Sequence, residues 1–130
     1  MPFHRKKTIV TAGIETAFQP RGTNCLGSIS GRITIDSSPD LRLLLLAALQ
    51  ESHCEILTVD LHQVDYIDTS GLAVLLEVLR AARILNKRFQ LSGLGERPRY
   101  LLEMARLLPL FDEADPEVSE VKGSRGGKLQ

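Results

Sequence analysis

A short and nearly continuous apolar run, Ile56 to Leu61, constrains the fold more than any other part of this sequence. Such a run is typical of a central strand that is buried on both faces of a sheet. A long helical pattern follows, from Asp68 to about Asn86, and Arg88 to Leu91 has the pattern of another strand. Because strands separated by helices are joined by crossovers into parallel pairs, this part of the chain predicts an α/β fold.

The residues before this run predict two more strands and a helix. Thr8 to Ala17 has a strand pattern, and the dense turn signal from Gln19 to Asn24 leads to a second strand, Cys25 to Ile35. Glycines at 27 and 31 interrupt the second strand, which favours a bulged or irregular conformation. The two strands are expected to pair as a hairpin.

The first helix is predicted to begin at Ser38 and to end near Ser52. Ser38 can cap the helix, and Pro39 suits the first helical position because its missing N–H costs nothing there. The following residues are apolar nearly all round, so the helix must be covered on more than one side.

The last third of the chain contains a shorter predicted helix from Pro98 to Leu108, and Phe111 is expected to return an aromatic ring to the core. After Asp112 the apolar pattern fades into an acidic segment and then a basic, glycine-rich one. We therefore expect one domain over residues 1–112 and a mobile tail over residues 113–130.

Composition excludes several classes of function. The 130 residues fit one hydrophobic core, and 16 basic against 16 acidic side chains leave no net field that would attract nucleic acid. The basic N-terminus is not followed by the apolar run of a signal peptide, and the longest apolar run, Leu43 to Leu49, is too short to cross a bilayer. We expect a cytoplasmic protein that does not insert into membranes. Cys25 and Cys54 are expected to be buried thiols rather than a disulfide.

The most informative motif is Asp68-Thr69-Ser70-Gly71-Leu72, where a strand leads into the long helix. Three residues with capping side chains meet the unpaired N–H groups of the first helical turn. The positive end of the helix dipole would stabilise a phosphate on Thr69 or Ser70, whereas the carboxylate of Asp68 would repel it. The same residues could simply cap the helix, which is the plainer interpretation.

This motif resembles the Asp-Ser-Ser/Thr-Gly-Leu signature of STAS domains of the anti-sigma factor antagonist type. The similarity extends in order over Gly31, the strand Ile56 to Leu61, the motif helix, the strand Arg88 to Leu91 and the block Leu107 to Phe111. It covers roughly residues 8–112. The resemblance implies a single STAS-like domain with a mixed sheet of four to five strands and helices mainly on one face.

The resemblance also implies a function by binding rather than by catalysis. The residue after the motif aspartate, here Thr69, would be phosphorylated by an anti-sigma factor that is itself a serine/threonine kinase, with Ser70 as the second choice. A PP2C-type phosphatase would reverse the modification. ATP and magnesium would belong to the kinase, so no cofactor is expected in this chain, and a second copy of the chain is a further candidate partner.

Alternatives remain for both the function and the binding surface. Threonine at the motif position also occurs in stressosome-type scaffolds and in STAS subunits of lipid-transport ABC systems, which would bind without modification. The apolar character of the motif helix extends beyond its core stripe through Val74 and Val78, so either a partner or the first helix covers this flank. The predicted partner-binding residues are those of the motif, Asp68, Thr69, Ser70, Gly71 and Leu72, together with Val74 and Val78. Asp60, Asp65 and Asp68 lack the accompanying His or Cys spacing of a metal site, and no convergent acid, base or nucleophile indicates an enzyme.

Overall fold

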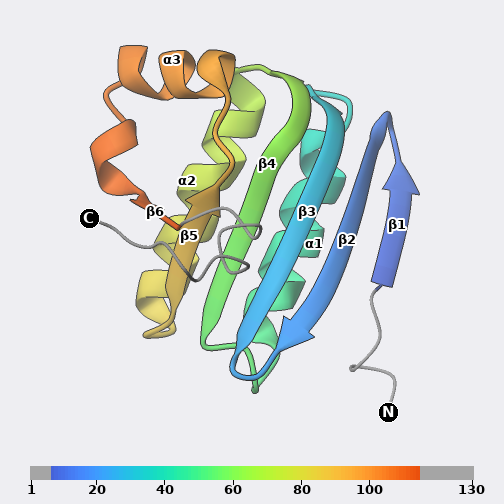
Figure 1. Ribbon diagram of the computed structural model, residues 1–130, viewed down its shortest axis with the longest axis vertical. Helices are drawn as coiled ribbons and strands as arrows, with labels where there is room; N and C mark the ends of the chain where they lie inside the picture. Colours follow the sequence, from blue (N-terminus) through green and yellow to red (C-terminus); the bar gives the residue numbers. More distant parts are fainter. Residues whose placement is uncertain (1–6, 115–130) are drawn as a thin grey trace, which may run out of the picture.

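The computed structural model describes residues 7–114, which form one mixed six-stranded sheet with helices. The strands are β1 (Lys7–Thr11), β2 (Ile14–Arg21), β3 (Asn24–Ile33), β4 (Ile56–Ile67), β5 (Arg88–Ser92) and β6 (Asp112–Glu113), and they lie in sequence order across the sheet. The first three strands are antiparallel, and β3 to β6 are parallel (Figure 1). The predicted α/β class is confirmed, with six strands instead of four to five.

Two hairpins form the N-terminal part of the sheet, one more than predicted. The residues from Thr8 to Ala17 belong to two strands, because Ala12 and Gly13 both have positive φ angles and form a tight turn between them. Such angles suit the two-residue loop of a β-hairpin. The irregularity predicted for β3 is confirmed by register shifts against β4 between Ser28 and Ser30 and between Gly31 and Arg32.

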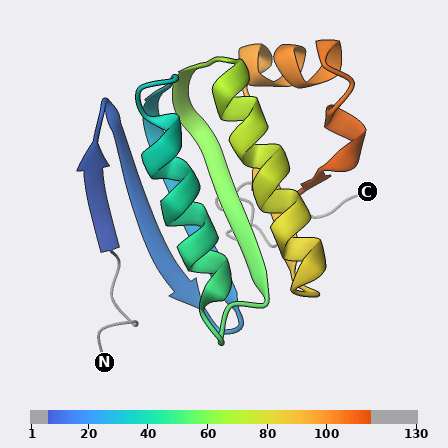
Figure 2. The same cartoon turned by 180° about the vertical axis from the view of Figure 1, so that it is seen from behind.

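Helices α1 (Ser38–Gln50) and α2 (Thr69–Ile84) cover the same face of the sheet, as Figure 2 shows. The cap of α1 is Ser37 rather than Ser38, and the helix ends at Gln50 rather than near Ser52. Pro39 lies in the first turn as predicted. Between the helices and the sheet is the core, whose fully buried members include Ile29, Ile33, Leu41, Leu45, Leu49, Leu57, Val59, Leu75, Val78 and Leu91.

Strand β4 continues through Ile67, six residues beyond the predicted apolar run. Its second half contains His62, Gln63 and Asp65, whose side chains are exposed. The helix-free face of the sheet accepts such polar side chains. Asp60 and His62 therefore lie within the strand and not at its end.

The C-terminal part of the described chain packs against β5. Helix α3 (Glu96–Met104) is followed by the 3-10 helix η2 (Leu108–Leu110), and the buried ring of Phe111 meets Phe89 edge-on with centroids 6.2 Å apart. The expected return of Phe111 to the core is confirmed. The sheet reaches Glu113, one residue past the predicted domain boundary, and the predicted tail from residue 115 onward lies outside the described residues.

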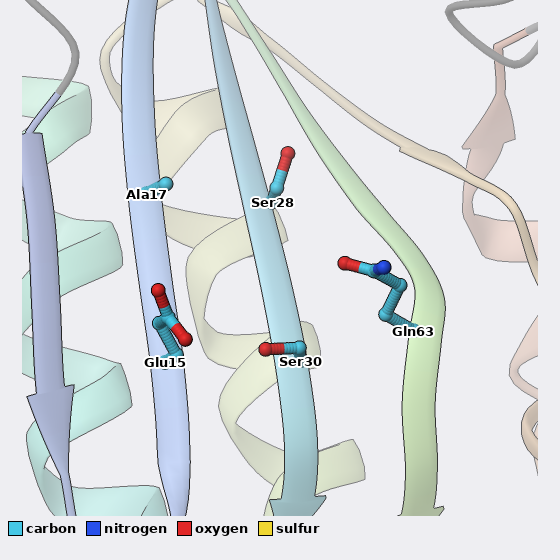
Figure 3. Close-up of a pocket in the computed structure, with 5 residues that line it drawn as sticks. All are labelled: Glu15, Ala17, Ser28, Ser30 and Gln63. Atoms are coloured by element: carbon cyan, nitrogen blue, oxygen red, sulfur yellow. The ribbon is translucent and has the colours of Figure 1, made fainter.

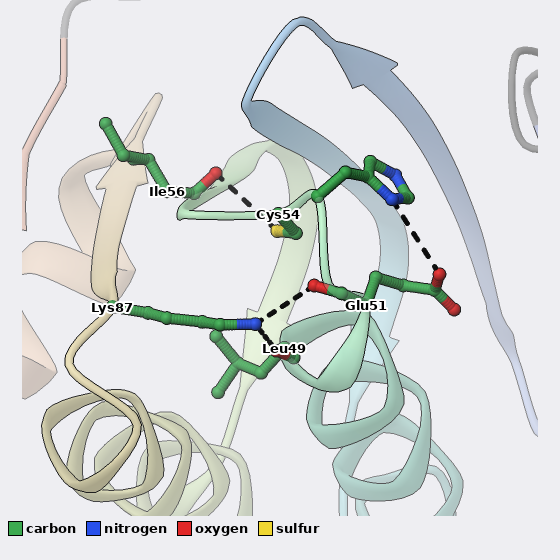
Figure 4. A network of polar contacts seen from close by, with 6 residues as sticks. Leu49, Glu51, Cys54, Ile56 and Lys87 are labelled. Atoms are coloured by element: carbon green, nitrogen blue, oxygen red, sulfur yellow. Dashed lines mark hydrogen bonds and ion pairs between the residues drawn. The ribbon is translucent and has the colours of Figure 1, made fainter.

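One polar network ties the end of α1 to the beginning of β5 (Figure 4). The ammonium group of Lys87 donates hydrogen bonds to the carbonyl oxygens of Leu49 and Glu51, at the negative end of the helix dipole. Cys54 lies beside this network, and both Cys25 and Cys54 are buried free thiols, as predicted. Burial, followed by the nearby Cys25 thiol, raises the pKa of Cys54 to about 12, so this group is a neutral thiol at physiological pH.

Within the described part of the chain, no helix is long and apolar enough to span a membrane.

Candidate functional site at the start of helix α2

Asp68 caps helix α2 with one oxygen of its carboxylate and binds the loop after β3 with the other. Oδ1 accepts hydrogen bonds from the backbone N–H groups of Ser70 at 2.9 Å and Gly71 at 3.2 Å. Oδ2 accepts from the backbone N–H of Ile35 at 3.2 Å, and Asp68 N–H donates to the carbonyl of Ile33 at 3.1 Å. The carboxylate therefore satisfies two orphan donors of the helix and also fastens the loop after β3 to it.

The environment of Asp68 favours its ionised form. Partial desolvation of the carboxyl opposes ionisation, but the hydrogen bonds from the Ser70 hydroxyl and from the N–H groups of Gly71, Ser70 and Ile35 outweigh it and lower the pKa of Asp68. The site carries a fixed negative charge at neutral pH.

The hydroxyl of Ser70 is held between two partners. It lies 2.5 Å from Asp68 Oδ1 and 2.7 Å from the Ser38 hydroxyl, which is also 2.8 Å from the carbonyl of Thr34. The Ser38 and Ser70 hydroxyls have only two protons for these three contacts. Because a charged acceptor makes the stronger hydrogen bond, Ser70 donates its proton to the carboxylate of Asp68. Ser70 is thus oriented inward and joins the first turns of α1 and α2.

Thr69 differs from Ser70 in its exposure and in its hydrogen bonding. It is the first residue of α2 and is exposed, and within residues 7–114 its hydroxyl has no hydrogen-bond partner. A hydroxyl without a partner loses no native contact when it reacts. The predicted acceptor and its second choice, although adjacent in sequence, have opposite environments.

Gly71 and Leu72 serve the packing of the helix against the sheet. A Cβ atom at Gly71 would lie 2.6 Å from the Ile33 side chain and 2.7 Å from the Ile67 side chain, distances that no Cβ tolerates without movement. Leu72 is buried in the core. Both motif residues bring α2 close to β3 and β4 and do not form an exposed surface.

Val74 and Val78 are also buried, so the prediction that they bind a partner needs correction. Helix α1 packs against α2 and covers this flank, which is the second of the two interpretations that the sequence allowed. An ion pair between Arg42 of α1 and Glu77 of α2, at 2.6 Å, fastens the helices together on the outer side. Of the motif residues 68–72, only Thr69 is exposed.

The aspartates considered as a metal site have separate roles. Asp60 is nearly buried and accepts two hydrogen bonds from His62, at 3.1 Å from its backbone N–H and at 2.8 Å between Oδ2 and ring Nδ1. Asp68 caps α2, and Asp65 is exposed on β4. Among the described residues, no three His, Cys, Asp or Glu side chains are grouped so that they could hold a metal ion.

A shallow polar depression of about 130 Å³ lies on the sheet face opposite the helices (Figure 3). Glu15, Ala17, Ser28, Ser30 and Gln63, from three neighbouring strands, line it. These side chains do not converge with the motif residues, and the depression contributes nothing to the site at the start of α2.

Sequence reasoning missed two parts of the site. Ser38 had been interpreted as a helix cap, but its hydroxyl contacts Ser70 instead. Ile35 contributes a backbone N–H to Asp68, and a backbone donor leaves no signal in the residue type. Both contacts depend on how the loop before α1 lies against α2, which no local pattern encodes.

Several solved structures have the same fold as this chain. A solved anti-sigma factor antagonist from Mycobacterium paratuberculosis superposes with a TM-score of 0.67 at 21% identity, over 90% of this chain and all of that one. The anti-sigma factor antagonist SpoIIAA is similar in its unphosphorylated form (TM-score 0.65, 14% identity, 96% and 100% coverage). The phosphorylated form of SpoIIAA from Bacillus is also similar (TM-score 0.61, 13% identity, 93% and 100% coverage).

At these identities the three structures establish a common fold. The sequence itself matches a family model described as "Mlab, STAS domain" over residues 17–110, which is most of the chain and includes the whole motif at the start of α2. This chain therefore belongs to the STAS domain family.

Proposed function

We propose that this protein is an anti-sigma factor antagonist that binds an anti-sigma factor kinase and is switched off by phosphorylation of Thr69. The observation that carries the proposal is the contrast between the two neighbouring hydroxyls. Thr69 is exposed without a hydrogen-bond partner among the described residues, whereas Ser70 is held by Asp68 and Ser38. The protein acts in the cytoplasm, where the kinase and the sigma factor are found.

In the phosphorylation step, the γ-phosphoryl group of ATP moves to Thr69 Oγ1, the hydroxyl proton is lost, and ADP leaves. Asp68 orients this part of the chain but does not take the proton, because hydrogen bonds occupy its carboxylate and its pKa is lowered. The general base and the magnesium ion belong to the kinase. A PP2C-type phosphatase returns the protein to its binding form by hydrolysing the phosphate ester.

The phosphate acts on binding because of what surrounds it. It adds nearly two negative charges beside the carboxylate of Asp68, at the exposed end of α2 that remains for a partner. A partner surface complementary to the unmodified site would have to bury this charge without a counterion, which is costly. The fold tolerates the modification because the exposed Thr69 hydroxyl makes no hydrogen bond to the described residues that a phosphate would break.

Phosphosite mapping with the cognate kinase tests the proposal. The purified protein is incubated with the kinase and ATP, and the product is digested and analysed by mass spectrometry, beside the Thr69→Ala and Ser70→Ala variants. We expect phosphate on Thr69 in the wild type and in Ser70→Ala, and none in Thr69→Ala. Modification of Ser70 alone, or none by an active kinase that binds the protein, would refute the proposal.

A second candidate is a constitutive STAS module, such as a subunit of a lipid-transport ABC system or a stressosome-type scaffold. It is supported by the threonine at the motif position and by the match to the family model described as "Mlab". In that case the same end of α2 would dock a partner with the Thr69 hydroxyl in contact, Thr69→Ala would lose activity, and no phosphorylated form would occur in cells.

A further inference from the structure

Three side chains from different elements form a cluster at the end of the sheet where α2 begins. The guanidinium carbon of Arg32 lies 4.4 Å from the centroid of the Tyr66 ring, and that of Arg97 lies 5.2 Å from it. Arg32 is paired with Tyr66 across β3 and β4, and Arg97 is in the first turn of α3. Figures 1 and 2 show that the end of β4 and the starts of α2 and α3 lie at the same end of the sheet.

The two arginines of this cluster have no acidic partner in the described part of the chain. Both arginines make cation–π contacts with Tyr66, and both side chains are exposed. Other arginines are neutralised by carboxylates: Arg42 pairs with Glu77, Arg88 with Asp112 and Arg99 with Glu113. Two like charges on one ring repel each other, and an anion between them would remove that repulsion.

Two short backbone links connect the cluster to Asp68, the cap residue of α2. Tyr66 precedes the cap residue Asp68 by two positions. Arg32 directly precedes Ile33, whose carbonyl accepts the hydrogen bond from Asp68 N–H at 3.1 Å. Arg32 and Tyr66 are therefore linked to the cap residue of α2 by short backbone segments, and an arginine has a long side chain.

We propose that Arg32 and Arg97 form the receptor for the phosphate group on Thr69. Guanidinium groups bind phosphate oxygens in a bidentate manner, and the Tyr66 ring positions both guanidinium groups at this end of the sheet. The inference rests on the proposed phosphorylation of Thr69. The two arginines would stabilise phosphorylated Thr69 and offset its repulsion by the carboxylate of Asp68.

The test measures the second pKa of the phosphate, which is about 6 for phosphorylated side chains. The full-length protein is produced with phosphothreonine inserted at position 69 during translation, so no kinase is required. The phosphate is titrated by phosphorus-31 NMR. Because nearby cations favour the dianion, its pKa is lower in the wild type than in the double variant Arg32→Gln/Arg97→Gln.

We expect the double variant to raise the phosphate pKa by roughly half a unit or more, as loss of two nearby cations does. The charge-conserving variant Arg32→Lys/Arg97→Lys keeps most of the lowering. Arg83→Gln, an exposed arginine in the last turn of α2, is the matched control and leaves the pKa unchanged. Arg32→Gln and Arg97→Gln alone should each raise the phosphate pKa by part of this amount. The single variants replace the double variant in the titration if the double variant does not fold.

The acidic residues that neighbour the motif and the arginine cluster in the sequence are Asp36, Asp40, Asp65, Asp68 and Glu96. They are the same in every one of these proteins, so their effect on the phosphate pKa cancels in the comparison. Equal phosphate pKa values in the wild type and the double Gln variant would refute the proposal that Arg32 and Arg97 bind the phosphate. That result would leave the proposed switch intact, whereas a failure of the kinase to modify Thr69 would refute the switch and leave the titration unaffected.

Discussion

The hydroxyl oxygens of Ser38 and Ser70 lie 2.7 Å apart and connect the first turns of the two helices that cover the sheet. The same Ser70 hydroxyl is 2.5 Å from the cap carboxylate of Asp68. This arrangement assigns the two adjacent motif hydroxyls to different tasks, because Ser70 holds the helices in place and Thr69 faces the exterior.

This division predicts unequal effects on stability. Ser70→Ala removes the donor to Asp68 and the partner of Ser38, and should lower the free energy of unfolding by about 1–2 kcal/mol. Thr69→Ala removes an exposed hydroxyl that has no hydrogen-bond partner in residues 7–114, and should change it by less than about 0.5 kcal/mol. Urea unfolding of both variants measures the difference. A larger loss in the Thr69 variant would show that the assignment of roles is reversed.

The lowered pKa of Asp68 predicts a dependence of stability on pH. Because the folded pKa is below the unfolded value of about 3.9, the ionised carboxylate contributes stability above that value, and the contribution is lost as pH falls through the folded pKa. Asp68→Asn should therefore be less stable than the wild type at pH 7, and the difference should shrink at acidic pH. Unfolding curves at a series of pH values test this, and a difference that is constant with pH would contradict it.

The close approach at Gly71 predicts that a single methyl group disturbs the packing of α2. Gly71→Ala places a carbon within 2.7 Å of the Ile33 and Ile67 side chains and should destabilise the domain by about 1–3 kcal/mol. Gly95→Ala is the matched control, because its Cβ would meet nothing closer than 3.8 Å and its φ of −77° is ordinary. Thermal unfolding compares them. Equal midpoints for the two variants would show that the helix shifts freely.

The sequence alone predicted the elements whose signals are local. The apolar run Ile56 to Leu61, the cap at Asp68 and the end of the long helix near Asn86 each depend on a few neighbouring residues, and all three are present. The turn at Ala12 was missed because alanine seldom has a positive φ, and the second half of β4 was missed because one face of the sheet is uncovered and accepts polar side chains.

The candidate site was predictable only in part, because some of its contacts join residues that are far apart in the sequence. Asp68 and its role as a cap follow from the residues around it, whereas the contrast between Thr69 and Ser70 depends on Ser38, which is 32 positions from Ser70 in the sequence. The burial of Val74 and Val78 depends on where α1 lies. Helical periodicity shows that a flank is apolar but not which element covers it.

Titration of the purified anti-sigma factor with the wild type, Thr69→Glu and Thr69→Ala tests the central claim most directly. Glutamate adds a charge beside Asp68 that the partner must bury, so Thr69→Glu should bind at least about tenfold more weakly, equivalent to ~1.4 kcal/mol or more. Thr69→Ala removes only a hydroxyl and should bind within about threefold of the wild type, a change of less than ~1 kcal/mol. Equal affinities of Thr69→Glu and the wild type would contradict a switch at this residue.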